Sequence, residues 1–314
     1  MPVWQLSSGP STRPYADVFM KHCVGLIGPG DAGRWTPQRD DIVFEGGFVR
    51  RFASEMQTGD IVLLRTAAST ICAVGLVASE YLYLDQFDDV NGWDLQHARR
   101  IRWCSLPQPY TFDGQMFGAN PARCSRVWSE EAIEYVRRFV NSPPTQWQTA
   151  PLPALPQEEP PLANIPTAIR DVVAQAQDLA PLYLDGEKCR ELPTEDELVG
   201  HFVLPLLRSL VWPPERIAVK WRYIDVTVFS TLPRIPENCR FIIEAKRFGA
   251  GVEGALEQAK GYIESLGVMR DVLVTDGIRY RLYSARDEFA PVAYANLIRL
   301  KASAVRLFDY MKRQ

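Results

Sequence analysis

Prolines divide this chain into two parts. Residues 141–166 hold eight prolines and show almost no periodic pattern of apolar residues. Proline has no backbone N–H and a restricted φ, so such a segment is typical of an extended linker between domains. The length of 314 residues also suits two domains. We therefore expect a first domain over residues 1–145, a linker over 146–164 and a second domain over 165–314.

The composition is that of an ordinary globular protein, with 46% hydrophobic and 23% charged residues. The sequence has no apolar run of the length that a transmembrane helix needs and no N-terminal secretory pattern. The six cysteines are scattered without a CxxC pair, which predicts free, mostly buried thiols. The three histidines are too few and too dispersed for a histidine-built metal hydrolase. We expect a cytoplasmic protein with no membrane partner.

The net charge of −3 argues against a strongly basic nucleic-acid-binding protein. Residues 1–164 carry 14 Lys and Arg against 18 Asp and Glu, a net charge of −4. Residues 165–314 carry 21 against 20, a net charge of +1. Any binding to nucleic acid must therefore come from a local basic surface.

The first domain is predicted to be rich in strands. Residues 58–67 follow a turn signal with a β-branched and leucine run, and 71–84 form a second such run. Residues 98–106 alternate like a half-buried strand. Residues 129–140 have helical spacing, with Ser129 as the N-cap and acids in the first turn. This order fits a small β-barrel with helices packed outside it.

The second domain alternates helices and strands, which predicts an α/β arrangement of helices around one mixed sheet. Thr194 followed three residues later by Glu197 is a capping box, and Gly267 closes the last helix. Helices are expected over 165–180, 193–210 and 252–267, and strands over 216–229, 240–246 and, as a pair around the turn TDG, 269–285.

Charged residues interrupt two of these apolar strands. Glu244 and Lys246 are at positions i and i+2 of a strand, so their side chains project from the same face. Adjacent strands lie about 4.8 Å apart, so Asp225 on a neighbouring strand would place its carboxylate beside that of Glu244. Two such carboxylates attract a hard cation such as Mg²⁺, with the carbonyl oxygen of Ala245 as a further ligand. Lys246 would then face a metal-bound water or a phosphate.

Buried salt bridges, Glu244 with Lys246 or Asp225 with an arginine, are the structural alternative, because short patterns of this kind are common. Three features of the context favour a site: the two strands are consecutive, an acid begins the preceding helix, and the following helix carries Gln258 and Tyr262. These last two residues are four apart and share one face of that helix.

Residues 193–283 resemble the PD-(D/E)XK nuclease superfamily, and most closely the nuclease domain of type I restriction-enzyme motor subunits. The resemblance implies a restriction-endonuclease-like fold that hydrolyses DNA with Mg²⁺, for which Mn²⁺ can substitute. The family motif maps onto Glu195, Asp225, Glu244, Lys246, Gln258 and Tyr262. It implies a metal held by Glu195, Asp225, Glu244 and Ala245. The sequence departs from the pattern at Ile224, where the family name has proline. Arg247 and Lys260 are candidates for contacts to the DNA backbone, or plain surface charges.

The strand order of the first domain resembles the EVE, YTH and PUA-like small β-barrels, in which a GD-x-V strand precedes a G-x-V strand. TGDIVLLR and AVGLVAS match that outline. The resemblance implies a pocket for a flipped, modified base, which must be stacked and hydrogen-bonded to recover the cost of unstacking. The candidates for the pocket are Trp35, Tyr83, Trp93, Asp94 and Trp103, with Arg99 and Arg100 as phosphate contacts. Core packing of these aromatic residues is the alternative.

The sequence therefore predicts a metal-dependent endonuclease of two domains that restricts foreign, modified, double-stranded DNA. Cutting both strands needs two active sites, so a homodimer is expected. Two alternatives stay open. The chain is a nucleic-acid-binding module whose nuclease fold is inactive or serves a partner, or it is a nuclease directed at RNA.

Overall fold

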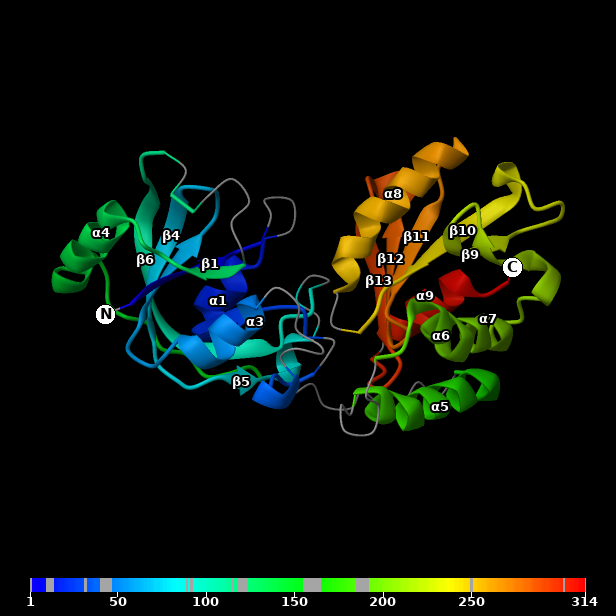
Figure 1. Cartoon of the computed structure of the whole chain (residues 1–314), viewed down its shortest axis with the longest axis horizontal. Helices are drawn as coiled ribbons and strands as arrows, with labels where there is room; N and C mark the ends of the chain where they lie inside the picture. The colour runs from blue at the N-terminus through cyan, green and yellow to red at the C-terminus, as the bar shows by residue number, and fades with distance from the viewer. Residues whose placement is uncertain are drawn as a thin grey trace. The chain divides into compact units, whose positions relative to one another are not determined.

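The computed structural model describes residues 2–9, 14–30, 33–39, 47–88, 90, 93–114, 116–117, 123–154, 165–184, 192–248, 251–301 and 303–313. The chain divides into two compact units, Met1–Leu155 and Pro156–Gln314, each with its own core (Figure 1). The division falls within the proline-rich segment. Among the described residues, no helix is both long and apolar enough to span a bilayer. The described cysteines are all free and Cys72 is the only one of them not buried, whereas Cys189 lies outside the described residues.

The first unit is built on a mixed sheet that curls into a half-barrel (Figure 1). Its strands run in the order β2, β6, β4, β3, β1, β7, and β5 pairs with β6. The pair β1 and β3 is parallel and the other pairs are antiparallel. The strands are β1 Val3–Ser7, β2 Val24–Ile27, β3 Ile61–Arg65, β4 Thr70–Val77, β5 Leu82–Tyr83, β6 His97–Thr111 and β7 Cys124–Arg126.

Short helices lie beside this sheet. They are α1 Ala16–His22, η1 Pro37–Arg39, α3 Phe48–Arg50, η2 Arg51–Glu55, η3 Asp85–Phe87 and α4 Glu130–Asn141. Helix α4 confirms the prediction for 129–140, and the Ser129 hydroxyl accepts the Ala132 N–H at its start. Val136 and Phe139 belong to the same hydrophobic core as Leu63 of β3.

The expected strands of this unit are present with different limits. The run 71–84 is divided between β4 and β5, and 98–106 is the middle of the much longer β6. The first part of the predicted linker belongs to this unit. Gln148 donates its backbone N–H to the Trp103 carbonyl at 2.7 Å, and Arg100 donates to the Ala150 carbonyl.

The second unit holds a mixed sheet in the order β13, β12, β11, β10, β9, β8. Among the described strands of this second sheet, only β10 and β11 form a parallel pair, and helix α8 connects them as a crossover. The strands are β8 Ile217–Trp221, β9 Ile224–Phe229, β10 Cys239–Ala245, β11 Asp271–Thr275, β12 Arg279–Ser284 and β13 Ala290–Asn296.

The helices of this unit are α5 Thr167–Leu184, α6 Glu195–Leu198, η4 Val199–Val203, α7 Leu204–Ser209, η5 Pro214–Arg216, η6 Pro236–Asn238, η7 Val252–Gly254, α8 Ala255–Leu266 and α9 Ser303–Met311. The helix predicted over 193–210 contains a π-helical stretch, η4, just before Pro205. Proline offers no N–H to the preceding turn, which accounts for the altered hydrogen bonding there.

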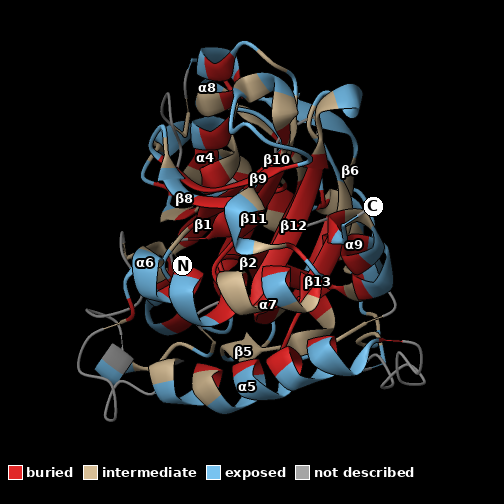
Figure 2. Ribbon diagram, turned by 90° about the vertical axis from the view of Figure 1, so that its right-hand side faces the viewer, coloured by how far each residue is buried: buried red, intermediate tan, exposed pale blue. Residues whose placement is uncertain are grey.

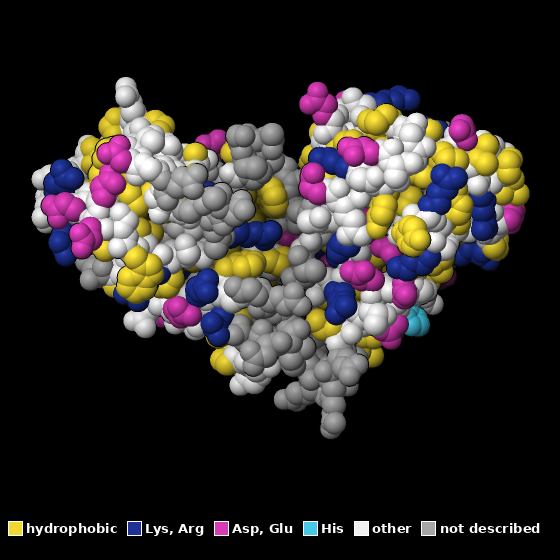
Figure 3. Space-filling view, turned by 45° about the horizontal axis from the view of Figure 1, so that its top comes forward, with side chains coloured by type: hydrophobic (Ala, Val, Ile, Leu, Met, Phe, Trp, Pro, Cys, Tyr) yellow, Lys and Arg dark blue, Asp and Glu magenta, His cyan; other side chains and the backbone are white. Residues whose placement is uncertain are grey.

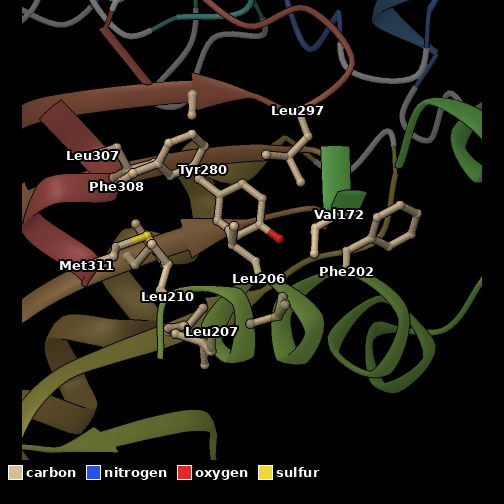
Figure 4. Packing of buried hydrophobic residues seen from close by; sticks show 14 of the residues in the cluster. Val172, Phe202, Leu206, Leu207, Leu210, Tyr280, Leu297, Leu307, Phe308 and Met311 are labelled. Atoms are coloured by element: carbon tan, nitrogen blue, oxygen red, sulfur yellow. The ribbon is translucent and has the colours of Figure 1, made fainter. Parts of the chain in front are cut away.

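Successive side chains of β10 enter two different cores. Phe241 and Ile243 point into a core with α5, α7 and α9, and Ile242 points into a core with α8. Figure 4 shows Tyr280 of β12 packed over Leu206 of α7 in the first of these cores. Figure 2 shows the strands buried along most of their length and helix α5 buried along one side only.

The prediction of one strand over 216–229 is wrong. The segment is a hairpin, β8 and β9, closed by the pair Trp221 and Ile224. Its turn residues Arg222 and Tyr223 both have positive φ, 51° and 69°. Neither residue type signals such a turn, so the sequence pattern reads as continuous. The strand β13 and the helix α9 were also not predicted.

Candidate active site

Two carboxylates face each other on the α8 side of the second sheet. Ile243 pairs with Val226 across β10 and β9, so the next residues along, Glu244 and Asp225, are opposite each other. Both side chains are buried. Asp225 Oδ2 accepts the Ala245 N–H at 2.7 Å, which ties the end of β10 to β9. The sheet register therefore places these two acids side by side, as the sequence analysis predicted.

Glu244 has one satisfied and one unsatisfied oxygen. Its Oε1 accepts a hydrogen bond from Lys246 Nζ at 2.9 Å, whereas its Oε2 is buried without a hydrogen-bond partner. Burial raises the pKa of Glu244 from 4.5 to about 7, and the nearby Asp225 carboxylate acts in the same direction. The hydrogen bond from Lys246 opposes this rise in pKa. This oxygen without a partner is the atom of the site that could bind a cation and be satisfied by it.

A hydrogen-bonded chain fixes Lys246. Its ammonium group also donates to Gln258 Oε1 at 2.9 Å, and Gln258 Nε2 donates to the Tyr262 hydroxyl at 2.8 Å. Gln258 and Tyr262 lie one turn apart on α8, which runs across this face of the sheet (Figure 1). The structure brings together Lys246 and the helical pair that the sequence analysis singled out.

Glu195 reaches the site from the start of α6. Thr194 is the N-cap and forms the predicted capping box with Glu197. Glu197 is therefore engaged in the helix cap. Glu195 Oε1 lies 4.0 Å from Lys246 Nζ. The capping role of Glu197 agrees with the prediction. Glu195, predicted to be a metal ligand, lies beside the Lys246 ammonium.

Lys220 is a member of the site that sequence reasoning missed. Its Nζ donates to Asp225 Oδ1 at 2.6 Å and lies 3.0 Å from Asp196 Oδ1. Its hydrogen bond to Asp225 raises the pKa of Lys220. Lys220 lies opposite Asp225 only because β8 and β9 form a hairpin, with Val219 paired to Val226. A sequence analysis that recognised the turn at Arg222 would have placed Lys220 opposite Asp225.

The predicted set of metal ligands is only partly assembled. The described residues contain no group of three His, Cys, Asp or Glu side chains placed to hold a metal ion. Glu195 is separated from Glu244 by the Lys246 ammonium, and both oxygens of Asp225 already accept hydrogen bonds. The donor set that fits a hard cation is Asp225 and Glu244, and one or two carboxylates with several waters suffice for Mg²⁺.

The two residues predicted to contact the DNA backbone, Arg247 and Lys260, differ in their exposure and in their contacts within the protein. Arg247 is exposed just after β10. Lys260 on α8 is half-buried, pairs with Glu257 at 2.7 Å and lies 5.6 Å from the centre of the Phe289 ring. Lys260 is therefore already engaged with its own helix and with Phe289.

Part of the predicted base pocket gathers in the first unit. The half-buried Trp35 donates its backbone N–H to the Tyr81 hydroxyl at 3.0 Å, and the two rings meet edge to face. Tyr81 also hydrogen-bonds His97 Nδ1 at 2.7 Å, and Tyr83 donates to the Gly30 carbonyl at 2.7 Å. Tyr81 and His97, absent from the predicted set, complete this aromatic group.

The other predicted pocket residues have different surroundings. The prediction for Trp103 is wrong: its ring is fully buried, stacks on Phe19, and its indole N–H donates to the Val24 carbonyl at 2.8 Å. A base cannot reach it without opening the core. Trp93 contacts Tyr15 edge to face, and Asp94 is buried.

The predicted phosphate contact of Arg99 is also wrong. Its guanidinium is buried and donates to the carbonyls of Phe52, Ala53 and Ser79, which fastens η2 to the sheet. Arg100 is half-buried and holds the segment that includes Ala150. Both side chains donate to backbone carbonyls of the same unit and so help to hold the fold together.

Comparisons with known proteins do not assign a function to the chain. A family of domains of unknown function (DUF8426) matches residues 38–119. No curated protein matches the chain. A similar solved structure is the X-ray crystal structure of protein Atu2648 from Agrobacterium tumefaciens, with 18% identity over 47% of this chain and 99% of that one. Its TM-score of 0.26 is too low to support an argument about fold or function.

Proposed function

We propose that the second unit is a metal-dependent DNA endonuclease and that the protein restricts foreign, modified DNA. The observation that carries this proposal is the buried Glu244 Oε2, which lacks a partner beside Asp225 and Lys246. A buried carboxylate oxygen without a partner costs stability, and a bound cation would satisfy it. The resemblance to the PD-(D/E)XK nucleases supports the same conclusion.

Each side chain of the site has a separate task in phosphodiester hydrolysis. Asp225 and Glu244 would hold the Mg²⁺, and the Ala245 carbonyl lies at the same strand end. The bound ion supplies Lewis-acid activation of water and of the phosphate. Lys246 is the cation that would stabilise negative charge developing on the phosphate. Gln258 orients Lys246 through its amide oxygen.

The two remaining residues act through Lys246. Tyr262 accepts from the Gln258 amide and so limits the rotation of that side chain. Glu195 Oε1 lies 4.0 Å from the Lys246 ammonium and helps to hold it in place by charge attraction. Both are positioning residues in this scheme.

The first unit would select the DNA. Its half-buried aromatic group of Trp35, Tyr81 and Tyr83 offers rings for stacking to an extruded base. A homodimer would supply the two active sites needed to cut both strands.

One observation favours a second candidate function, a nucleic-acid-binding unit that does not cleave. Lys220 occupies Asp225 Oδ1, and Lys246 occupies Glu244 Oε1. Lysines that neutralise both carboxylates permanently would leave a unit that binds nucleic acid without hydrolysing it.

Cleavage of phage DNA tests the proposal. Modified and unmodified DNA, and RNA of matched length, are incubated with Mg²⁺ and either wild type, Lys246→Ala or Lys312→Ala. Lys312 is an exposed lysine paired with Asp309, and its variant is the matched control. We expect cleavage of modified DNA by the wild type and the control only. Equal cleavage by Lys246→Ala would overturn the site, and binding without cleavage in any divalent metal would favour the second candidate.

A further inference from the structure

The turn between β8 and β9 carries an unfavourable backbone with large side chains. Trp221 pairs with Ile224, so Arg222 and Tyr223 form the whole connection. Their φ values of 51° and 69° are those of a type I′ turn. Asn-Gly is the favoured pair there, because side chains with a Cβ are strained at positive φ. The fold alone would be served better by smaller residues.

Both side chains of this turn project into solvent. Tyr223 is 86% exposed. Arg222 is exposed as well, and its guanidinium lies 4.7 Å from the centre of the Trp221 ring. Isolated exposed hydrophobic residues need no explanation. Here, however, an aromatic ring and a cation are presented together on a short, well-anchored turn.

The turn adjoins the candidate active site. Asp225 is two residues beyond Tyr223, and Lys220, two residues before Arg222, contacts Asp225 directly. Basic and acidic side chains both lie on the face visible in Figure 3. The net charge of the chain is −3, so a strong overall positive charge is not what draws a polyanion to this protein. Local contacts that combine a phosphate-binding cation with a stacking ring are therefore the effective ones.

We propose that Arg222 and Tyr223 form a nucleic-acid contact beside the active site. The Tyr223 ring stacks on an unpaired base of the strand whose backbone enters the site, and Arg222 binds an adjacent phosphate. This inference rests on the proposed function of the second unit, and it adds two residues that contact the strand outside the motif.

The test uses a variant that improves the turn while it removes the contact. Replacing both residues, Arg222→Asn with Tyr223→Gly, installs the preferred type I′ pair. Tyr223→Phe keeps the ring. Val211→Gly is the matched control, because Val211 is also an exposed residue with positive φ (71% exposed, φ 67°) in the same unit. Binding of labelled single-stranded and duplex DNA is measured by fluorescence anisotropy in EDTA, so that cleavage does not interfere.

We expect the double variant to bind single-stranded DNA at least about fivefold more weakly, since one aromatic–base stack accounts for roughly 5- to 150-fold in affinity. Its melting temperature should equal or exceed that of the wild type. Tyr223→Phe and Val211→Gly should bind as the wild type does. Arg222→Ala alone should lower the slope of log affinity against log salt by about 0.7, the value for one phosphate contact on a single strand.

Unchanged binding by the double variant would overturn the inference, as would an equal loss in Tyr223→Phe. Cleavage in Mg²⁺ separates the two proposals. If the wild type cleaves DNA and the double variant binds normally, only the turn contact fails. If the wild type neither binds nor cleaves, both proposals fail.

Discussion

Replacing Glu244 with glutamine is expected to stabilise the second unit at neutral and alkaline pH when divalent cations are absent. The folded-state pKa of Glu244 is raised, mainly by burial, from 4.5 to about 7. Between these two pH values the folded chain retains a proton that the unfolded chain has released. The wild type therefore loses stability as the pH rises through this interval, and the loss is nearly complete about one pH unit above the folded-state pKa.

The size of this loss follows from the difference between the two pKa values. It corresponds to about 3 kcal/mol of unfolding free energy, most of which is lost between about pH 5 and pH 8. Glutamine cannot ionise, so the Glu244→Gln variant should lack this component of the pH dependence. The ion pair with Lys246 exists only in the ionised form of Glu244 and is already contained in the raised pKa, so the change of stability with pH is the informative quantity.

Hydrogen exchange of peptides covering β10 measures the opening free energy of this unit in the full-length chain. Wild type and Glu244→Gln are compared from pH 5 to pH 8 in EDTA, with Glu264→Gln, an exposed acid on α8, as the control. Stability curves of wild type and Glu244→Gln that run parallel would refute the reasoning. Added Mg²⁺ should stabilise the wild type at pH 8 and leave Glu244→Gln nearly unchanged, because the ion requires the carboxylate.

Three further predictions follow from other contacts. Lys220→Met should tighten Mn²⁺ binding by about fivefold, measured by calorimetry, because the partly exposed ammonium no longer competes for Asp225. Trp103→Ala should lower the stability of the first unit by about 3–5 kcal/mol in denaturant unfolding, whereas Trp35→Ala should cost less and weaken binding of modified DNA. Thr194→Ala should cost about 1 kcal/mol, because it removes the capping box of α6.

Each of these predictions has a clear contrary result. Unchanged or weaker Mn²⁺ binding by Lys220→Met would show that the lysine does not oppose the metal. Equal destabilisation by the two tryptophan variants would contradict the assignment of Trp103 to the core. Thr194→Ser retains a capping hydroxyl, so a loss of stability in this variant equal to that in Thr194→Ala would rule out the cap as the cause.

Local rules made much of the second unit predictable. The alternation of apolar residues located β10, and the spacing of Glu244 and Lys246 placed their side chains on one face, where they form a hydrogen bond. The capping box at Thr194 began α6 as expected. Such features depend on residues a few positions apart, whose geometry is set by the backbone of one helix or strand.

Contacts between residues far apart in the sequence were harder to predict. Arg99 and Trp103 look like surface residues of a binding strand in the sequence, but the folded chain surrounds them with carbonyl groups from Phe52, Ser79 and Val24. An arginine such as Arg99, which donates to three backbone carbonyls, gives no local signal, because its partners lie about 20 or more residues away.

The sequence by itself determined which residues share a strand face and where the helices begin, because the 2.0 and 3.6 residue periods are properties of the chain. Only the tertiary structure decided that Lys220 lies on Asp225, that Glu244 keeps one oxygen without a partner, and that Arg222 and Tyr223 form an exposed turn. These facts depend on the pairing of β8 with β9 and of β9 with β10, and on the burial that follows from packing α8 over the sheet.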